Sequence, residues 1–207
     1  MFREKSLDQF LNELASKAPV PGGGSVAALS GALAAGLVSM VCNLTLGKER
    51  YAHVQDEIRT LLGRSEGLRR RLIELLEDDV RVYTKVSAAY KMPRQSKEEK
   101  RTRAEAIQAA LKDATAIPMK VAEACVEILD LCIPVAEKGN VRAVSDVGVA
   151  ALMAEAGLRG AALNVLINLR AIKDEEFCKC EGGRLDALLE GKSELKEKIY
   201  KLVEDKL

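Results

Sequence analysis

The chain carries apolar residues at intervals of three and four along most of its length. Three stretches show this period clearly, from Arg50 to Tyr90, from Ser96 to about Glu137 and from Ser145 to Ile172. Such spacing places the apolar side chains on one face of an α-helix, whereas strand-like alternation is rare in this sequence. The pattern therefore predicts an all-α fold, a multihelical bundle with long antiparallel helices.

One further stretch is apolar on every side and carries no charge, from Val26 to Leu46. Small residues recur in it every four positions, which lets a second helix approach closely. The stretch is long enough to cross a bilayer, but it is rich in alanine, glycine and serine rather than in leucine and isoleucine. We therefore expect a central, buried, Ala/Gly-rich helix of a soluble bundle and no contact with a membrane.

Two helix starts are marked by capping boxes. Ser6 is followed three residues later by Gln9, and Ser96 is followed in the same way by Glu99. In such a pair each side chain accepts a hydrogen bond from the other residue's backbone N–H, which satisfies two groups that a helix start leaves free. Helices are therefore predicted to begin after Ser6 and Ser96, and Gly47 is suited to end the uncharged helix.

Glycine and proline predict irregularities inside the long helices. Gly63 and Gly67 are expected to break or bend the stretch that contains them, and Pro118 is expected to kink or restart the helix that follows Ser96. The tail from Asp174 is highly charged, and the pattern predicts only one short helix in it, from about Ser193.

Composition narrows the class of protein. The 207 residues are 48% hydrophobic, and 32 Lys+Arg against 31 Asp+Glu give a net charge of +1. One domain spanning residues 1–207 with a proper core is expected. The balanced charge, the 3% of aromatic residues and the absence of tryptophan argue against a partner that is nucleic acid or an anionic membrane.

Five cysteines and one histidine limit the available chemistry. The odd number of cysteines, without a secretion signal, predicts reduced thiols in a cytoplasmic protein. The single histidine, His53, lies in a charged segment, which excludes His-based triads and two-histidine zinc sites. No metal site is predicted, so carboxylates, amides, hydroxyls and helix ends are expected to carry the chemistry.

A glycine-rich turn precedes the uncharged helix and consists of Gly22, Gly23, Gly24 and Ser25. Glycines let another group come close to the backbone, and the first N–H groups of a helix attract anions. The turn lacks the GK[ST] ending of a nucleotide-binding loop, and no strand precedes it. Two interpretations remain open: a ligand-binding loop and a turn that packs helices together.

Asp79 interrupts the apolar stripe of the stretch from Arg50 to Tyr90. The rhythm requires an apolar residue between Leu75 and Val82, and an aspartate stands there instead. A carboxylate on a core stripe is costly unless it is paired, hydrogen-bonded or facing a cleft. Asp79 is therefore either a functional residue or the partner of a cation or cap on a neighbouring helix.

Three polar residues stand on the helix predicted from Ser145 to Ile172. Asp146 and Asn164 are 18 residues apart and point the same way, and Asn168 lies about 40° from them, but 18 residues of helix span about 27 Å. An unbroken helix therefore cannot bring Asp146 and Asn164 to one reacting atom. Three alternatives remain: the two residues bind opposite ends of a long ligand, they meet across a dimer, or one of them has only a structural role. Asp146 together with Ser145 also suits a helix N-cap.

The motifs occur in an order that resembles a known family. They are Pro21 to Ala28 (PGGGSVAA), Asp79 with Tyr83, Lys91-Met92-Pro93, Pro118, Gly139-Asn140, Ser145-Asp146 and Asn164 to Leu169 (NVLINL). The chain is similar over nearly its whole length to the cyclodeaminase domain of formiminotransferase-cyclodeaminase and to the related methenyltetrahydrofolate cyclohydrolases. The resemblance implies an all-helical homodimer that acts on a tetrahydrofolate derivative and uses no cofactor beyond that substrate.

The resemblance implies formiminotetrahydrofolate cyclodeaminase activity, in which 5-formiminotetrahydrofolate yields 5,10-methenyltetrahydrofolate and ammonia. The alternatives are methenyltetrahydrofolate cyclohydrolase activity and a non-catalytic helical dimer that keeps the fold. Asp79 and Asp146 are the candidate catalytic residues, one as general acid or base and the other as a group that binds the pterin or the cation. The candidate substrate-binding residues are Gly22, Gly23, Gly24, Ser25, Asn140, Ser145, Asn164 and Asn168.

Overall fold

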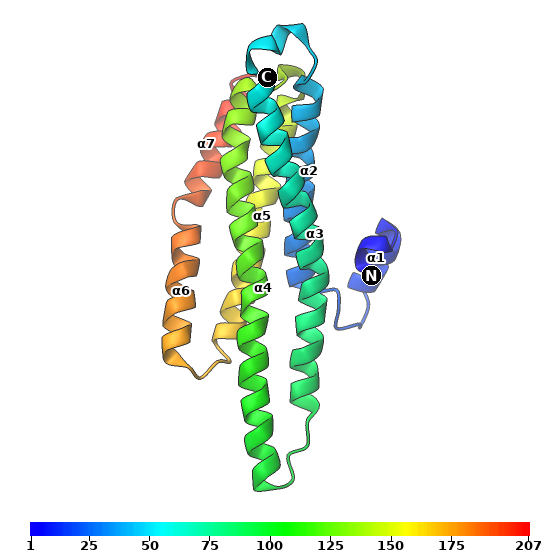
Figure 1. Ribbon diagram of the computed structural model, residues 1–207, viewed down its shortest axis with the longest axis vertical. Helices are drawn as coiled ribbons and strands as arrows, with labels where there is room; N and C mark the ends of the chain where they lie inside the picture. Colours follow the sequence, from blue (N-terminus) through cyan, green and yellow to red (C-terminus); the bar gives the residue numbers. More distant parts are fainter.

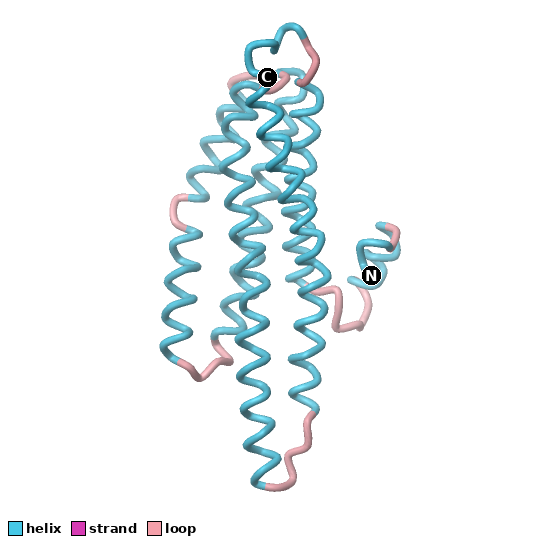
Figure 2. The backbone as a smooth tube through the Cα atoms, viewed as in Figure 1, coloured by secondary structure: helices cyan, strands magenta, loops and turns pink.

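The computed structural model describes residues 1–207 and contains helices and no strands, as the apolar period predicts (Figures 1 and 2). Seven α-helices occur in the order α1 (Leu7–Leu14), α2 (Gly23–Thr45), α3 (Gln55–Lys91), α4 (Lys97–Lys138), α5 (Val144–Leu169), α6 (Glu175–Leu189) and α7 (Lys192–Glu204). Three short 3-10 helices complete the chain, η1 (Phe2–Glu4), η2 (Glu49–Val54) and η3 (Val141–Ala143).

Helices α2 to α5 pack side by side as an antiparallel bundle (Figure 1). Helices α3 and α4 are the longest and project together beyond the end of α5, while α6 and α7 lie along the opposite side of the bundle from α1 (Figure 1). Helix α2 contacts α3, α4 and α5, and its inward face joins the main hydrophobic core. The prediction of a central Ala/Gly-rich helix is thereby confirmed.

Small residues let α2 and α5 approach closely. A Cβ atom added to Gly157 would lie 3.0 Å from the carbonyl oxygen of Ala27 and 2.9 Å from the Sγ atom of Cys125. A Cβ atom on Gly31 would meet the same sulfur at 2.9 Å. Few real Cβ atoms sit this close to another atom, so the separation of α2 and α5 depends on Gly157, and the packing of α2 on α3 and α4 depends on Gly31.

The capping boxes form as predicted. Ser6 Oγ accepts from the backbone N–H of Gln9 at 3.2 Å, and the Gln9 side chain accepts from the backbone N–H of Ser6 at 3.0 Å. The pair Ser96 and Glu99 repeats the arrangement at the start of α4. Gly47 follows the end of α2 with φ +73°, a left-handed conformation that favours glycine.

The long helices are not interrupted at the expected positions, so the predicted break at Gly63 and Gly67 and the predicted restart at Pro118 are wrong, whereas a bend or kink at these residues stays a prediction. Helix α3 runs unbroken through Gly63 and Gly67, and α4 runs unbroken through Pro118 and Pro134. A glycine costs a helix about 1 kcal/mol and an interior proline about 3 kcal/mol. Packing of both helices along the bundle outweighs these local costs, because α3 and α4 bury apolar residues on either side of each breaker.

The tail forms two helices rather than the one predicted. Helix α6 buries a single residue, Leu185, which packs with Met119, Ala162 and Val165 of α4 and α5. Because only one residue of α6 is buried, its sequence shows no repeated apolar positions at intervals of three and four, and the pattern therefore did not predict this helix. Gly191, with φ +67°, separates α6 from α7.

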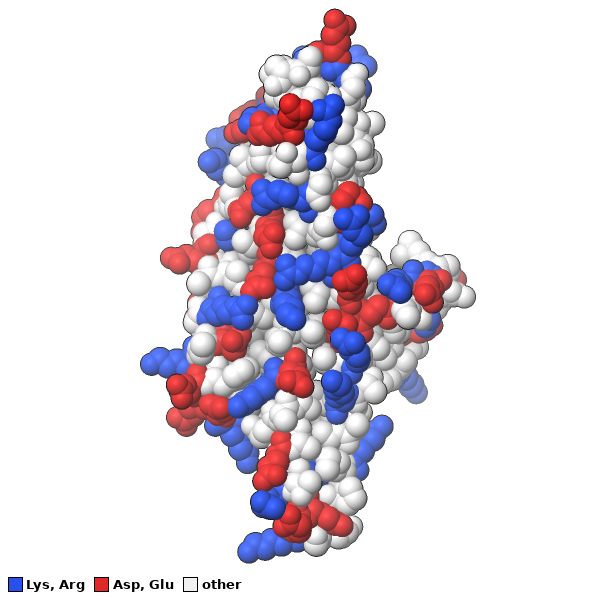
Figure 3. All heavy atoms as spheres, viewed as in Figure 1, with Lys and Arg blue, Asp and Glu red and all other residues white.

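Helices α2 and α5 leave one apolar face uncovered. Both are long and apolar enough to cross a membrane by length and composition alone, and their most apolar windows are 61% and 44% buried inside the bundle. The outward side chains form what we call the α2–α5 face: Val26, Leu33, Met40, Leu44, Val149, Leu152, Leu163, Leu166 and Ile167. The opposite situation holds on the side shown in Figure 3, where charged side chains of both signs are scattered over the surface.

Replacing Gly157 by alanine tests the close approach of α2 and α5. The new Cβ atom collides with backbone of α2, so we expect the free energy of unfolding to fall by about 1–3 kcal/mol. Gly63→Ala is the matched control, because no atom lies within 4 Å of its added Cβ. It should raise the free energy of unfolding by about 0.5–1 kcal/mol through helix propensity. Equal effects in urea denaturation would contradict the packing argument.

Candidate functional site

The carboxylate of Asp79 sits against the first turn of α2. Asp79 lies on the inward side of α3, and Ser25 Oγ donates a hydrogen bond to its Oδ2 atom at 2.7 Å. Ser25 itself is fully buried. No cation pairs with Asp79 within the chain, so the interpretation of Asp79 as half of a salt bridge is wrong and its bond to Ser25 is what holds it.

Gly24 allows the carboxylate to approach. A Cβ atom at this position would lie 2.2 Å from Asp79 Oδ1 and 2.7 Å from Asp79 Cγ. Gly22 is the N-cap of α2, and the helix offers no side-chain cap of its own. The carboxylate therefore stands where a capping group would, beside unpaired N–H groups and the positive end of the helix dipole.

Burial raises the pKa of Asp79 above its usual range, and the hydroxyl and backbone N–H of Ser25 partly oppose the shift because they stabilise the ionised form. A carboxyl group with a raised pKa can both take up and release a proton at pH values closer to neutrality than an exposed aspartate. The arrangement is that of a proton-transfer group rather than of a structural ion pair.

A cleft opens from Asp79 along α3, α4 and α5. Its volume is about 350 Å³, within the range of small-molecule sites. Most of its wall is apolar or aromatic, and the polar groups gather at the Asp79 end and along α5. The lining residues are Asp79, Val82, Tyr83, Val86, Tyr90, Leu111, Ala114, Pro118, Asn164, Ile167, Asn168 and Ala171.

Two asparagines of α5 face this cleft. Asn164 Nδ2 donates to the carbonyl oxygen of Gly160 at 2.8 Å, which leaves Asn164 Oδ1 free, and the added Cβ of Gly23 would lie 3.6 Å from Asn164 Nδ2. The side chain of Asn168 makes no hydrogen bond within the chain. The cleft thus offers one carboxyl group and two amides that can donate or accept hydrogen bonds.

The structure gathers five of the predicted site residues at one end of the bundle: Gly23, Gly24, Ser25, Asp79 and Asn164. Asn168 joins them as a lining residue of the cleft, and Gly22 adjoins them as the N-cap of α2. The interpretation of the glycine turn as a packing turn is supported, because Gly24 lies against Asp79 of α3 and Gly23 against Asn164 of α5. None of its residues lines the cleft, so the ligand-binding interpretation stays a prediction.

Asn140, Ser145 and Asp146 lie at the other end of α5. Helix α5 is continuous, so about 27 Å separates Asp146 from Asn164, and the two do not meet in one chain. Asp146 is partly exposed and makes no hydrogen bond, and the N-cap of α5 is Ala143, which makes the N-cap interpretation of Asp146 with Ser145 wrong. The single-chain geometry supports Asp79, and not Asp146, as the proton-transfer group of the cleft.

Asn140 has a structural task. Its backbone N–H donates to Thr45 Oγ1 at 2.8 Å, its Nδ2 donates to the carbonyl oxygen of Leu44 at 3.1 Å, and its Oδ1 accepts from the backbone N–H of Arg142 at 3.1 Å. These bonds tie the connection between α4 and α5 to the end of α2. The side chain lies at the opposite end of α5 from the cleft and does not line it.

Sequence reasoning missed Tyr90 as a wall of the cleft. Asp79, Tyr83, Val86 and Tyr90 follow one another at intervals of four, three and four, which places them on one face of α3. This spacing, which continues the stripe of Asp79 toward the end of α3, was the signal in the sequence that could have identified Tyr90. The Arg103 guanidinium donates to the carbonyl oxygen of Tyr90 at 2.9 Å and lies 5.8 Å from its ring, so a cation stands at this end of the cleft.

Comparison with known proteins gives a consistent picture. A sequence profile described as formiminotransferase-cyclodeaminase matches residues 6–182. A methenyltetrahydrofolate cyclohydrolase of Methylorubrum extorquens is 47% identical over 207 residues, which is 100% of both chains. The formimidoyltransferase-cyclodeaminase of Rattus norvegicus is 35% identical over 187 residues, which is 90% of this chain and 35% of the rat protein.

A solved structure supports the fold over the full length. The crystal structure of formiminotetrahydrofolate cyclodeaminase from Thermotoga maritima matches with a TM-score of 0.82 and 33% sequence identity, and the match covers 100% of this chain and 98% of that chain.

Replacing Gly24 by alanine tests the approach of Asp79 to α2. The new Cβ atom forces the carboxylate away from Ser25, and a displacement of about 1 Å costs an active site on the order of a hundredfold in rate. We therefore expect a loss of that size in kcat/KM with the helical circular dichroism retained. Gly23→Ala is the matched control, since its Cβ meets only Asn164 Nδ2 at an ordinary 3.6 Å. Equal losses in the two variants would contradict this geometry.

Proposed function

The chain belongs to the formiminotransferase-cyclodeaminase family, as the order of its motifs predicted, and on that premise we propose that it is a methenyltetrahydrofolate cyclohydrolase. It is a folate one-carbon enzyme that acts on tetrahydrofolate derivatives. The observation that carries the finer proposal is the 47% identity, from end to end, with a relative of that name.

The cyclodeaminases are more distant. The Thermotoga maritima and rat cyclodeaminases are 33% and 35% identical to this chain, and the rat protein is about three times as long as the part that matches. The motifs first suggested deamination. Because the sequence is more similar to the relative named a cyclohydrolase than to these cyclodeaminases, we propose hydrolysis instead.

Hydrolysis adds one water molecule at the methenyl carbon. The water oxygen bonds to this carbon, which lies between N5 and N10 and shares their positive charge, and one water proton departs. The bond from that carbon to N5 then breaks, N5 takes a proton, and the hydroxyl proton of the adduct leaves to solvent. The formyl group remains on N10, and one proton is released overall.

Asp79 suits the proton transfers in this sequence. Its carboxylate can take the proton from the attacking water and then deliver a proton to N5, and while ionised it stabilises the cationic substrate. Ser25 holds the carboxylate at 2.7 Å and fixes its direction. Water and proton transfer suffice for this reaction, so we propose no cofactor beyond the substrate.

The remaining groups of the cleft suit the parts of the substrate that do not react. The amides of Asn164 and Asn168 match a pterin ring, which presents both donors and acceptors. Tyr83 and the apolar wall suit the flat faces of the ring system. We further propose a cytoplasmic homodimer, since the α2–α5 face is large, apolar and uncovered.

Formiminotetrahydrofolate cyclodeamination is the second candidate, favoured by the full-length match to the Thermotoga maritima structure. There N10 bonds to the formimino carbon and gives up its proton, the exocyclic nitrogen takes up a proton, and the bond from the carbon to that nitrogen then breaks so that ammonia leaves. The same carboxyl group can supply that proton, because the tetrahedral carbon lies in the same position between N5 and N10.

Asp79→Asn tests the proposed proton transfer. We expect kcat/KM for methenyltetrahydrofolate hydrolysis, followed by loss of the methenyl absorbance, to fall by about 10²–10⁴. Formiminotetrahydrofolate, followed by gain of the same absorbance, decides between the two activities. Asp78→Asn is the matched control and should stay within about twofold of the wild type, since Asp78 neighbours Asp79 on α3 but pairs with Arg81 at the surface and does not line the cleft. No turnover of either substrate by the wild type favours a non-catalytic dimer.

The same variant carries a stability prediction. Because the folded pKa of Asp79 lies above its unfolded value of about 3.9, its contribution favours folding at acid pH and is lost as the pH rises through the folded pKa. An asparagine does not ionise, so the Asp79→Asn variant does not lose stability as the pH rises. We expect its free energy of unfolding at neutral pH to exceed that of the wild type by up to about 1 kcal/mol. The difference should shrink below pH 4 in denaturant titrations.

Ser25→Ala tests how the carboxylate is tuned. The hydroxyl of Ser25 lowers the pKa of Asp79, so its removal raises that pKa further. If Asp79 acts as the base, the acid limb of the profile of kcat/KM against pH moves to higher pH in this variant. If the rate falls but the acid limb of the pH profile does not move, ionisation of Asp79 is not the cause of that limb.

A further inference from the structure

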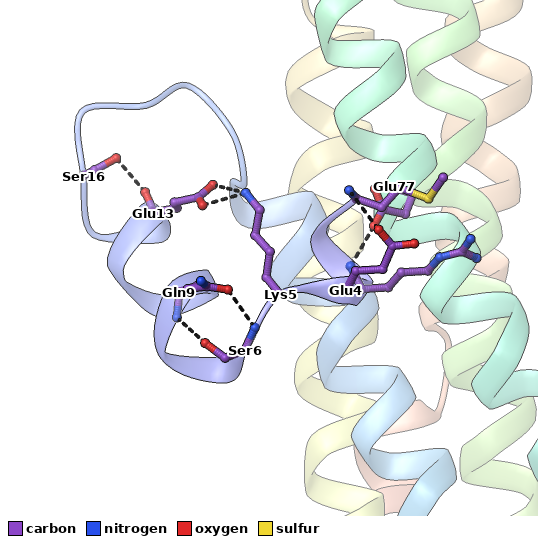
Figure 4. A network of polar contacts seen from close by, with 9 residues as sticks. Glu4, Lys5, Ser6, Gln9, Glu13, Ser16 and Glu77 are labelled. Atoms are coloured by element: carbon purple, nitrogen blue, oxygen red, sulfur yellow. Dashed lines mark hydrogen bonds and ion pairs between the residues drawn. The ribbon is translucent and has the colours of Figure 1, made fainter.

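The N-terminal arm, defined as residues 1–18, stands beside the bundle. Helix α1 stands beside the other helices: η1 rests on α3, and Phe10 and Leu14 of α1 pack against the main hydrophobic core (Figures 1 and 4). The backbone N–H of Arg3 donates to Glu77 Oε1 at 2.8 Å, which fixes the base of the arm to α3.

The arm is internally well ordered. Lys5 Nζ reaches Glu13 Oε1 at 2.6 Å, and the capping box of Ser6 and Gln9 closes the start of α1 (Figure 4). The rings of Phe2 and Phe10 pack edge to face with their centroids 6.0 Å apart. These contacts join η1 to α1 within the arm. The arm is therefore a shaped element held at a definite position.

The apolar stripe of α1, which consists of Leu7, Phe10, Leu11 and Leu14, is covered only in part. Phe10 is buried and Leu14 half-buried against the core, whereas Leu7 is 69% and Leu11 50% exposed. An amphipathic helix gains its stability by burying such a stripe. The fixed position of the arm thus leaves two leucines in water that an occupant would cover.

A groove connects this stripe to the α2–α5 face. A cavity of about 620 Å³ lies between the arm and the bundle, with Leu7 and Phe10 on one side and Leu76 on the other. A second cavity of about 610 Å³ continues from it along α2 to α5. The two share three lining residues, Leu29, Arg69 and Ile73. The stripe and the face form one continuous, mostly apolar surface.

We propose that the arm is a clasp for a second copy of this chain: two copies meet through their α2–α5 faces, and each arm closes Leu7 and Leu11 over its partner. This inference rests on the homodimer put forward with the proposed function. It adds that the N-terminal arm contributes to the dimer and that a second copy of the chain occupies the groove.

Charge favours a second copy as the occupant. Helix α2 carries no charged residue, and Arg69 at the floor of the groove is already paired with Glu66 at 2.7 Å. The other charged residues at the groove, Arg3, Glu4 and Lys5, belong to the arm, and Lys5 is paired with Glu13, so the bundle side of the groove carries no unpaired charge for a partner to recognise. Because α2 and α5 run antiparallel, a two-fold axis across their face sets each helix of the pair against its counterpart, which is the self-complementary arrangement of symmetric dimers.

The size of the face agrees with a dimer. Helix α2 has 23 residues and is therefore roughly 34 Å long, and two adjacent helices about 10 Å wide present on the order of 700 Å² per copy. Two copies would bury roughly 1,400 Å² before the arms are added, within the range of stable protein interfaces. A membrane is the alternative occupant, but the absence of tryptophan and the ion pair within the arm disfavour it.

The double variant Leu7→Asp/Leu11→Asp in the full-length chain tests the clasp. We expect sedimentation velocity to give a dimer for the wild type and a dissociation constant at least tenfold larger for the variant, with unchanged helical circular dichroism. Leu207→Asp is the matched control, since Leu207 is an exposed leucine at the other terminus, and it should dimerise as the wild type does. An unchanged dissociation constant in the double variant overturns the clasp and leaves the dimer standing.

Hydrogen exchange shows whose surface the arm covers. Amides of residues 7–14 should become protected only at protein concentrations above the dissociation constant. Equal protection in the monomer overturns the clasp, because the arm then closes on its own chain, and a wild type that stays monomeric overturns dimer and clasp together. Flotation of the wild type, but not of the double variant, with vesicles of anionic phospholipid overturns the clasp in favour of a membrane. These readouts are independent of turnover, so failure of the proposed activity is seen separately.

Discussion

The structure depends on how closely the start of α2 approaches α3. At Gly24 the backbone comes so near Asp79 that no side chain fits between them, and Ser25 then reaches the carboxylate at 2.7 Å. A buried, unpaired carboxylate is costly, and the unpaired N–H groups of a helix start are also costly. Contact between the carboxylate and the start of α2 lowers both of these free-energy costs. No cation pairs with Asp79, so its pKa stays raised and it remains able to exchange protons.

The close packing of α2 has a second consequence at the surface. Small residues let α5 lie against α2, and Gly157 of α5 meets the backbone of α2 at the centre of the bundle. Both helices bury one side, and the larger side chains on the other side project outward and form the α2–α5 face. The composition that brings Asp79 and Asn164 to one cleft therefore also produces the apolar surface that an association would cover.

Much of this arrangement could be predicted from the sequence, for physical reasons that also mark the limit. The break in the apolar stripe at Asp79 and the glycine turn are local signals, and each indicated its own end of the contact. The rise per residue of an unbroken helix is by itself enough to separate Asp146 from Asn164. The cleft was not predictable, because its walls come from three helices and its opening depends on α5 ending at Leu169 while α3 and α4 continue. Helix α6, anchored by Leu185 alone, gave no period to detect.

The choice between hydrolysis and deamination does not rest on the proton-transfer group. Both reactions pass through a tetrahedral carbon between N5 and N10, and a single carboxyl group with a raised pKa serves either one. The two reactions differ in the atom outside the ring, which is a water oxygen in one and the formimino nitrogen in the other, so selectivity depends on the groups that meet this atom. Because the proton-transfer group is common to both reactions, one fold can serve relatives that are named for different activities.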